Sequence, residues 1–557
     1  MTLVADHSQP PPSYEEAQQR GSSTIPVELN ITASEDPIGP NGDYLVHVNI
    51  TPPIGTKRAP VDVCCVIDVS GSMASEATMT NEKGDRESDG LTILDLVKHA
   101  VKSIVHNLTD GDRLAIVRFS DDAKTLLPLT AMTADGRKLA EKELDQLVPL
   151  DCTNLWAGLD MGLDVLKEVQ TDASAPLSRM ASVLLFTDGI PNVEPPRGHI
   201  PMLRQYRDAN GGVLPGIVNT FGFGYSLKSA LLDEMATEGR GAYSFIPDGS
   251  FVGTTFINAT SNLLTTMATG ARLFVELKNG ARLADEEGNE RNLNSLNIPL
   301  TNLQYGQSKD VILRMKILPL KEANSYLTAT LTYQALQDTP ENPSQVTALG
   351  IRRTNSPTEI NTHLFRTEFV SAIRKAMQAM QSGKRDDALG LLKSLQDRIE
   401  GSSAATASAV SALLEDLKGQ ATQAFDLKYY NRWGKHYLPS LIRAHELQIC
   451  NNFKDPGVQV YGGTLFKSLQ STIEKVFVDL PPPKPSRKPA MRKGSVYGGG
   501  RGAAVGGMAQ TRADPSSTPS YMSRYYSSAN PCFAGWCTVR MEGGKMKRVG
   551  ELRRGDK

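Results

Sequence analysis

Two acidic and three hydroxyl residues in this sequence have the types and positions of ligands for a hard divalent metal ion. Asp68 ends the apolar stretch VDVCCVID, and Ser70 and Ser72 follow at steps of two. Thr153 begins a helix-like stretch, and Asp188 ends the apolar stretch ASVLLFTD. Oxygen atoms of this kind suit Mg²⁺, and open α/β sheets bind ligands at the C-terminal ends of their strands. The spacing therefore predicts a metal site at one edge of a sheet.

The same residue types would also suit a metal-dependent hydrolase with a serine beside the ion. However, no histidine adjoins these motifs: His99 and His106 lie on one predicted helix, and His199 lies in a proline-rich loop. Neither strand ends in a Gly-x-Ser-x-Gly sequence. We therefore favour binding over catalysis at this site. Thr153 has a structural alternative as well, because its hydroxyl could cap the helix that follows.

The elements that must position these residues are visible in the hydropathy pattern. Between residues 60 and 265, buried strands alternate with amphipathic helices, which indicates a doubly wound, mainly parallel α/β sheet. The strand patterns at 26–59 and 266–355 are expected to pair in a β-sandwich, with the α/β domain inserted beside it. Asn279-Gly280 is expected to form a hairpin turn in the second of these stretches. Residues 356–479 are predicted to be helical.

The composition excludes several functional classes. The chain has 557 residues and a formal net charge of −1, so no overall field favours nucleic acid or an anionic membrane. No apolar run reaches the ~18 residues of a transmembrane helix, and the N-terminus lacks the pattern of a signal peptide. Six cysteines are too few for a disulfide framework in this length. We expect an intracellular, cytoplasmic protein.

The stretches DVSGSM, CTNLWAGL and FTDG together resemble the von Willebrand factor A (VWA) domain and its metal-ion-dependent adhesion site, or MIDAS. The resemblance implies Mg²⁺, or another hard divalent cation, held by Asp68, Ser70, Ser72, Thr153 and Asp188. It also implies a position on the metal for an acidic residue of a protein partner, in keeping with the exchangeable positions that Mg²⁺ retains in proteins. The acidic stretch 76–89 departs from this pattern, and we expect it to cover or tune the metal face.

Residues 1–25 are rich in Pro, Gln and Ser and are predicted to be a disordered tail. Within them, Pro11, Pro12 and Tyr14 resemble the PPxY ligand of WW domains, including those of HECT-type ubiquitin ligases. The two prolines favour a polyproline II helix, and the tyrosine ring follows at the spacing that WW domains bind. WW-domain proteins are therefore expected partners, and a solvated tail is the alternative.

Residues 480–530 are rich in Pro, Gly and Ser and are predicted to be a disordered, basic linker. The segment 531–557 that follows resembles the start of a Hint module, the fold of Hedgehog autoprocessing domains and inteins. That resemblance implies a nucleophilic Cys532, whose thiol attacks the carbonyl of Pro531. The later Thr and His of that family have no counterpart here, so we expect an incomplete, inactive module. Ordinary thiols at Cys532 and Cys537 are the alternative.

The order of these segments resembles that of eukaryotic proteins, many of them fungal, that join a VWA domain to a Hint module. The predicted function is an intracellular scaffold that binds a protein partner through its metal and contacts ubiquitin ligases through its tail. Self-processing at the Hint module is the alternative, and it would require a complete module. A purely structural ion that braces the loops is the third hypothesis.

Overall fold

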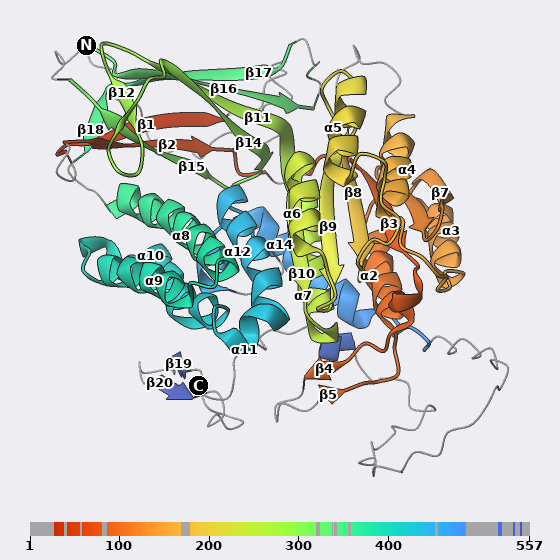
Figure 1. Cartoon of the computed structure of the whole chain (residues 1–557). Helices are drawn as coiled ribbons and strands as arrows, with labels where there is room; N and C mark the ends of the chain where they lie inside the picture. The colour runs from red at the N-terminus through yellow and green to blue at the C-terminus, as the bar shows by residue number, and fades with distance from the viewer. Residues whose placement is uncertain are drawn as a thin grey trace.

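The computed structural model describes most of the chain. The described residues are 27–37, 42–55, 58–80, 86–168, 179–318, 324–336, 338, 342–354, 358–451, 455–485, 522–525, 538–540 and 546–548. Within them, an α/β domain, a β-sandwich and a helical region lie against one another (Figure 1).

The main sheet of the α/β domain has the strand order β10-β9-β8-β3-β6-β7. Neighbouring strands are parallel, except that β7 is antiparallel to β6. Helices cover both faces of this sheet (Figure 1). The strands are β3 (Val61–Asp68), β6 (Arg113–Phe119), β7 (Ala123–Ala131), β8 (Met180–Thr187), β9 (Ile217–Phe223) and β10 (Arg240–Ile246). The helices are α2 (Ile93–Asn107), α3 (Ala134–Asp145), α4 (Leu155–Lys167), α5 (His199–Ala209), α6 (Ser229–Glu238) and α7 (Val252–Leu264).

Strands β3 and β8 form the centre of this sheet, and every residue of both is buried. Their sequences are nearly continuous apolar runs because helices cover both faces of a parallel sheet. Helix α2 begins at a capping box, in which the Thr92 hydroxyl accepts from the amide of Asp95 and the Asp95 carboxylate accepts from the amide of Thr92. The central strands β3 and β8 are parallel neighbours, so both end at the same edge of the sheet.

The β-sandwich is built from strands on both sides of the α/β domain in the sequence. One sheet has the order β13-β12-β15-β2-β1-β18 and the other β14-β11-β16-β17. Strand β2 pairs with β15 antiparallel, with Asn49 opposite Asp310. The strands are β1 (Glu28–Ser34), β2 (Tyr44–Thr51), β11 (Thr266–Leu277), β12 (Arg282–Ala284), β13 (Glu290–Arg291), β14 (Ser295–Gln304), β15 (Lys309–Lys316), β16 (Leu327–Ala335), β17 (Ser344–Gly350) and β18 (Arg352–Thr354).

The hairpin expected at Asn279-Gly280 is wrong. Both residues have the positive φ angles of a tight turn, +50° and +77°, but the flanking strands belong to different sheets. Strand β11 pairs with β14 and β16, whereas β12 pairs with β13 and β15. The turn therefore carries the chain from one layer of the sandwich to the other, a connection that local sequence does not distinguish from a hairpin.

The helical region packs against both other parts. Helix α14 lies on α2 and α7, α12 on β10 and α6, and α8 on β15. Its buried side chains form one hydrophobic core with those of the α/β domain, while the sandwich has its own core. The helices of this region are α8 (Thr358–Gln381), α9 (Arg385–Glu400), η3 (Ser403–Thr406), α10 (Ser408–Asp416), η4 (Leu417–Ala421), α11 (Leu427–Tyr429), η5 (Tyr430–Gly434), α12 (Lys435–Leu447), α13 (Pro456–Gln459) and α14 (Thr464–Asp479).

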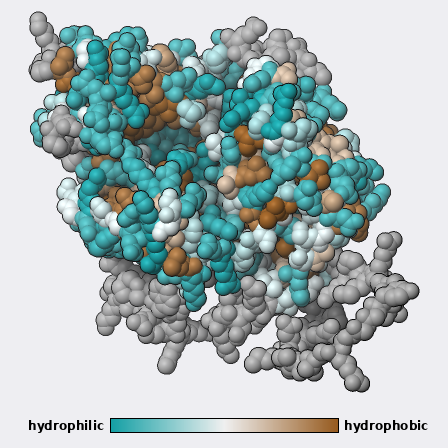
Figure 2. Space-filling view, viewed as in Figure 1, coloured by the Kyte–Doolittle hydropathy of each residue, from teal (hydrophilic) through white to brown (hydrophobic). Residues whose placement is uncertain are grey.

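These three parts confirm the predicted fold class of an α/β sheet with a β-sandwich and a helical region. Among the described residues, no helix combines the length and the apolar composition needed to cross a bilayer. A groove of about 600 Å³ runs between the sandwich and helices α8 and α9, and its lining includes Leu283, Ile298 and Leu364. Figure 2 shows a hollow near hydrophobic residues on the side of the molecule that carries the sandwich.

A packed segment interrupts the stretch that was predicted to be a disordered linker. Helix η6 (Met522–Tyr525) contacts η2 (Gly249–Phe251) and α14. Tyr525 is fully buried, and its hydroxyl donates a hydrogen bond of 3.0 Å to Oδ2 of Asp89. The prediction of a linker without fixed contacts is therefore wrong for these residues. Beyond them, β19 (Thr538–Arg540) pairs antiparallel with β20 (Met546–Arg548).

Candidate functional site

The loop after β3 carries three of the predicted ligands. Asp68 is the last residue of β3, and Ser70 and Ser72 lie at the start of η1 (Gly71–Ala74). The amide of Ser70 donates a hydrogen bond of 2.7 Å to Oδ1 of Asp68. The hydroxyl oxygens of Ser70 and Ser72 lie 3.2 Å apart. Steps of two along this loop therefore place one carboxylate and both hydroxyls on the same side.

Strand pairing brings Asp188 to the same place. Strands β3 and β8 are neighbours, with Ile67 opposite Phe186, so both chains leave the sheet at the same edge. The hydroxyl of Ser72 donates a hydrogen bond of 2.7 Å to Oδ1 of Asp188. The hydroxyl of Thr187 donates one of 2.6 Å to Oδ2 of Asp68. The two loops thus support each other's carboxylates.

Thr153 completes the cluster and does not cap helix α4. The cap is Asn154, whose side chain accepts a hydrogen bond from the amide of Ala157. The amide of Thr153 donates to Oδ1 of Asn192, at 2.9 Å. A Cβ atom at Gly189 would lie 3.4 Å from Oγ1 of Thr153 and 3.5 Å from Oγ of Ser72. Gly189 therefore leaves open a small space that three loops border.

Burial sets the electrostatics of this cluster. Asp68, Ser70, Thr153 and Asp188 are buried, whereas Ser72 is exposed. Within the described part of the chain, neither carboxylate forms an ion pair with a basic side chain. Burial raises the pKa of Asp68 to about 6 although hydrogen bonds from Thr187 and Ser70 oppose it. Burial also raises the pKa of Asp188 to about 7, and the nearby charge of Asp68 adds to the effect.

The donor set fits a hard divalent cation. Two carboxylates and three hydroxyls supply only oxygen atoms, which are the ligands that Mg²⁺ takes in proteins. Two buried carboxylates with no basic partner are costly when both are charged, and a cation among them would remove that cost. When bound, the ion would supply a positive charge and an open coordination position near the exposed Ser72.

The histidines considered in the sequence are engaged in other contacts. His99 is buried, and its Nε2 lies 2.9 Å from the carbonyl oxygen of Phe477. His106 pairs with Glu141, and His199 pairs with Glu194. Each of these contacts joins the histidine to a residue outside the set of Asp68, Ser70, Ser72, Thr153 and Asp188.

The acidic stretch 76–89 contains a short pair of strands, β4 (Met79–Thr80) and β5 (Arg86–Glu87). Oε1 of Glu76 accepts a hydrogen bond of 2.7 Å from the hydroxyl of Ser88. The carbonyl oxygen of Thr78 accepts from the amide of Gly249, and Asp89 accepts from Tyr525. The described contacts of this stretch thus run to η2, to η6 and to Leu91 and Thr92 just before α2. That it covers or tunes the metal face stays a prediction.

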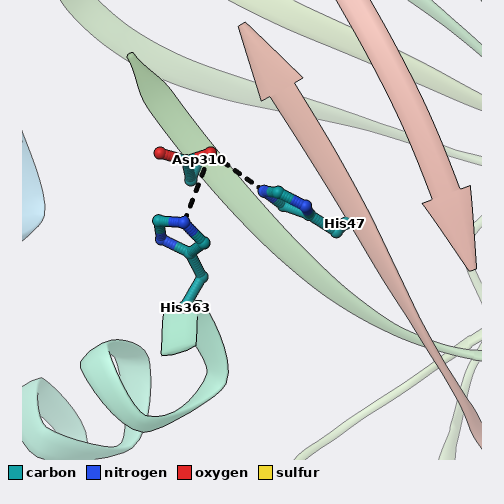
Figure 3. Close-up of side chains that lie close together, drawn as sticks. All are labelled: His47, Asp310 and His363. Carbon is teal, nitrogen blue, oxygen red and sulfur yellow. Dashed lines mark hydrogen bonds and ion pairs between the residues drawn. The ribbon is translucent and has the colours of Figure 1, made fainter. Parts of the chain in front are cut away.

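The structure also gathers a second cluster that the sequence does not indicate. His47, Asp310 and His363 come from β2, β15 and α8, and their ligand atoms all lie within 4.8 Å of one another (Figure 3). The sequence separation between His47 and Asp310 is 263 residues, and no short motif joins them. Only knowledge of the pairing of β2 with β15 and of the packing of α8 against β15 could have found this cluster.

The remaining predicted site residues lie outside the described part of the chain. These are Pro11, Pro12 and Tyr14 of the PPxY motif and Cys532 of the Hint-like segment. Their roles stay predictions.

Two family models match the chain. The one described as von Willebrand factor type A domain matches residues 63–190, which include all five predicted metal ligands. The one described as VWA / Hh protein intein-like matches residues 407–475, within the helical region. The second match lies N-terminal to the Hint-like segment and does not reach it.

Curated relatives and a solved structure agree with the first match. Inter-alpha-trypsin inhibitor heavy chain H3 of Pongo abelii is 27% identical over 237 residues, which are 42% of this chain and 24% of that protein. The probable E3 ubiquitin-protein ligase WAVH2 of Arabidopsis thaliana is 34% identical over 121 residues, 22% of this chain and 14% of that protein. The chain thus spans about a quarter or less of these relatives.

The solved structure is the von Willebrand factor type A protein from Catenulispora acidiphila. It superposes with a TM-score of 0.51 at 17% identity and covers 70% of this chain and 89% of that one. At that identity the likeness concerns the fold alone. The matched residues, the sheet order and the positions of the strand ends lead to one conclusion: residues 63–190 belong to a von Willebrand factor type A domain, and residues 407–475 match the family described as VWA / Hh protein intein-like.

Proposed function

We propose that this protein binds a protein partner through a Mg²⁺ ion held at the edge of the VWA sheet. The ligands are the residues of the cluster after β3, before α4 and after β8, namely Asp68, Ser70, Ser72, Thr153 and Asp188. The observation that carries this proposal is the convergence of two buried carboxylates without basic partners and three hydroxyls. Such a set supplies too few ligands to enclose the ion, because Mg²⁺ favours six positions and keeps some for exchange.

The partner contributes a carboxylate from an Asp or Glu. The two carboxylates of Asp68 and Asp188 neutralise the charge of a divalent cation, so the loaded cluster has no net positive charge. The ion is nevertheless hard, and it prefers an anionic oxygen as a further ligand. Ser72 is exposed beside the buried ligands, so an incoming side chain can approach from that side. The buried positions of Asp68 and Asp188 keep these two carboxylates away from competing solvent.

Capture of acidic peptides tests this function. A displayed peptide library is selected on the full chain in Mg²⁺ and again in EDTA, and the enriched peptides are synthesised with each Asp or Glu changed to its amide. We expect peptides that bind only with Mg²⁺ and that lose binding when one acidic residue is amidated. Asp68→Ala should abolish capture. Peptides that bind equally well in EDTA, or to Asp68→Ala, would sink the proposal.

We also infer that the N-terminal tail recruits WW-domain proteins through Pro11, Pro12 and Tyr14. The support is the motif itself and the similarity of this chain to ubiquitin ligases such as WAVH2. A chain that binds one protein at the metal and a WW-domain ligase at its tail would place the two together inside the cell. Titration of isolated WW domains against the full chain tests this, and Tyr14→Ala should remove binding. Tyr44, in β2, is left unchanged in that variant and serves as an internal reference for folding.

A second candidate function is cleavage before Cys532, which would require a complete Hint module. The match of residues 407–475 to the family described as VWA / Hh protein intein-like favours it. The Cys532 thiol would attack the carbonyl carbon of Pro531, the amide bond would break, and a thioester and a free amine would form. An external thiol would then release the N-terminal part as a new thioester. Incubation with a mild thiol followed by mass spectrometry tests this, and a fragment that persists in Cys532→Ala would rule it out.

A further inference from the structure

His47, Asp310 and His363 meet where the sandwich contacts the helical region. Nε2 of His47 lies 2.9 Å from Oδ1 of Asp310, and Nε2 of His363 lies 3.5 Å from the same oxygen. Figure 3 shows both rings directed at that carboxylate from opposite elements. The two imidazole rings are stacked with their centroids 5.0 Å apart. Three metal-ligating groups therefore face a common point at a junction between parts of the chain.

We propose that these three side chains form a second metal site, which binds Zn²⁺ and is separate from the Mg²⁺ site of the VWA domain. Two imidazoles and one carboxylate form a ligand set that zinc takes, with bond lengths of about 2.0–2.2 Å. A tetrahedral ion with such bonds holds its ligand atoms ~3.3 Å apart. The two nitrogen-to-oxygen distances, 2.9 and 3.5 Å, lie on either side of that value.

A purely hydrogen-bonded cluster explains this geometry less well. The contact of His47 with Asp310 is a good hydrogen bond, at 2.9 Å. The 3.5 Å separation of His363 from Asp310 is longer than a normal hydrogen bond between these groups. His363 also has its Nδ1 atom buried, with no partner among the described residues. Hydrogen bonding therefore satisfies neither nitrogen of His363 well, whereas a metal ion would engage its Nε2.

Surrounding polar groups hold the carboxylate in place, as outer residues do in metal sites. The side-chain amide of Asn49 donates to Oδ1 of Asp310 at 2.8 Å, and the hydroxyl of Ser308 donates to Oδ2 at 3.0 Å. The side chain of Gln448 also holds the backbone of Asp310. Its Oε1 accepts a hydrogen bond from the amide of Asp310, and its Nε2 donates one to the carbonyl oxygen of Asp310. The Asp310 side chain is 2% exposed. The ligand is thus fixed and shielded from solvent.

A cavity provides room for a further ligand. It has a volume of about 250 Å³ and is lined by Asp310 and His363, together with Gln307 and Tyr461. Gln307 is 2% exposed, and neither its amide oxygen nor its amide nitrogen has a hydrogen-bond partner among the described residues. A buried amide without partners is costly, and a metal-bound water in the cavity would supply one. The fourth position of the zinc ion therefore opens toward this cavity.

The site would join two parts of the protein. His47 and Asp310 belong to paired strands of the sandwich, whereas His363 is in the second turn of α8. A bound ion would cross-link the sandwich to the helical region and thereby stabilise their contact. It shares no residue with the cluster of Asp68 and Asp188, so failure of one site leaves the other intact.

Zinc titration of the full, metal-stripped chain tests this proposal. A competing zinc-chelating dye reports affinity, and thermal unfolding reports the coupling to stability. We expect stoichiometric binding, an increase in melting temperature with Zn²⁺, and a loss of affinity of ~100-fold or more in His363→Ala. His106→Ala removes an exposed histidine on α2 and should behave like the wild type. Asp68→Ala should lose Mg²⁺ binding and retain Zn²⁺.

Two measurements on the wild type keep the test decisive if a variant unfolds. X-ray absorption of the zinc-loaded chain should show nitrogen and oxygen scatterers without sulfur, which separates this site from the cysteines. Co²⁺ in place of Zn²⁺ should give the intense visible bands of a tetrahedral site. Absence of stoichiometric zinc binding, sulfur ligation, or equal affinity in a folded His363→Ala variant would overturn the proposal.

Discussion

The hydroxyl of Ser72 donates a hydrogen bond of 2.7 Å to Oδ1 of Asp188, across a sequence separation of 116 residues. Ser72 comes from the loop after β3, and Asp188 follows β8, the neighbouring strand in the sheet. This bond fixes the distance between the two halves of the proposed Mg²⁺ site before any ion is bound. Binding of Mg²⁺ would replace this hydrogen bond by coordination of both side chains.

Asp188→Asn should weaken Mg²⁺ binding by ~100-fold or more, because the ion loses one of its two anionic ligands. In EDTA the variant should be as stable as the wild type or slightly more stable, since it removes a buried charge that faces Asp68. Isothermal titration with Mg²⁺ and thermal unfolding in EDTA measure the two effects. Asp135→Asn, on the exposed side of α3, is the matched control. Unchanged Mg²⁺ affinity in the Asp188 variant would refute the assignment.

Mg²⁺ affinity should fall as the pH decreases from 8 to 6, by roughly tenfold or more. Burial raises the pKa values of Asp68 and Asp188 to about 6 and about 7, and both carboxyl groups must lose their protons to bind the cation. Without metal, the stability of the fold should change with pH in the opposite direction to the Mg²⁺ affinity. A raised carboxyl pKa contributes stability at low pH that is lost as the pH rises toward 7. Titrations with Mg²⁺ at several pH values check this, and a flat profile contradicts it.

Gly189→Ala should leave folding intact and weaken Mg²⁺-dependent peptide capture about tenfold. The added methyl group would lie 3.4 Å from Oγ1 of Thr153 and 3.5 Å from Oγ of Ser72, which are ordinary contact distances. It would therefore cover the hydroxyls without displacing the backbone. Thermal unfolding and peptide capture are compared with those of Gly390→Ala, a helical glycine of α9 with open space around it. Equal capture by the two variants would argue against Thr153 and Ser72 as ligands.

His99→Gln should reduce the dependence of stability on pH. Burial lowers the pKa of His99 to about 4, although its bond to the Phe477 carbonyl opposes the shift. The contribution of neutral, buried His99 to the free energy of unfolding is present above pH 6.5. It is lost as the pH falls toward 4, by up to about 3 kcal/mol.

The amide of glutamine at position 99 can still donate to the Phe477 carbonyl but does not titrate. The difference in free energy of unfolding between wild type and His99→Gln should therefore shrink between pH 7 and pH 4.5. Urea denaturation at both pH values measures that difference, in which contributions from other buried groups cancel. A difference that stays constant would show that His99 does not charge on unfolding.

The proposed Mg²⁺ site could be predicted from sequence because its geometry follows from local rules. Asp68 and Asp188 each end a buried strand, and parallel neighbours bring such ends to one edge of a sheet. Thr153 was ambiguous, since the sequence could not show that Asn154 takes the capping role.

Other features depend on contacts that no local pattern encodes. The turn at Asn279-Gly280 has hairpin residues but crosses between sheets, because β11 and β12 find their partners elsewhere. Tyr525 lies in a stretch of linker composition, and its burial depends on a surface formed by distant segments. The cluster of His47, Asp310 and His363 likewise exists only through strand pairing and helix docking. Long-range packing, rather than propensity, decides these cases.

The pairing of β2 with β15 has a consequence for synthesis on the ribosome. Asn49 emerges early, but its partner Asp310 is separated from it by 261 residues, with the whole α/β domain between them. Strands β1 and β2 therefore lack their partner strand β15 while the intervening domain folds, and an isolated two-stranded unit is only marginally stable in water. During that interval the edge of β2 exposes unpaired backbone groups to other nascent chains. Translation speed and chaperone supply should consequently determine the yield of folded protein more strongly than its final stability does.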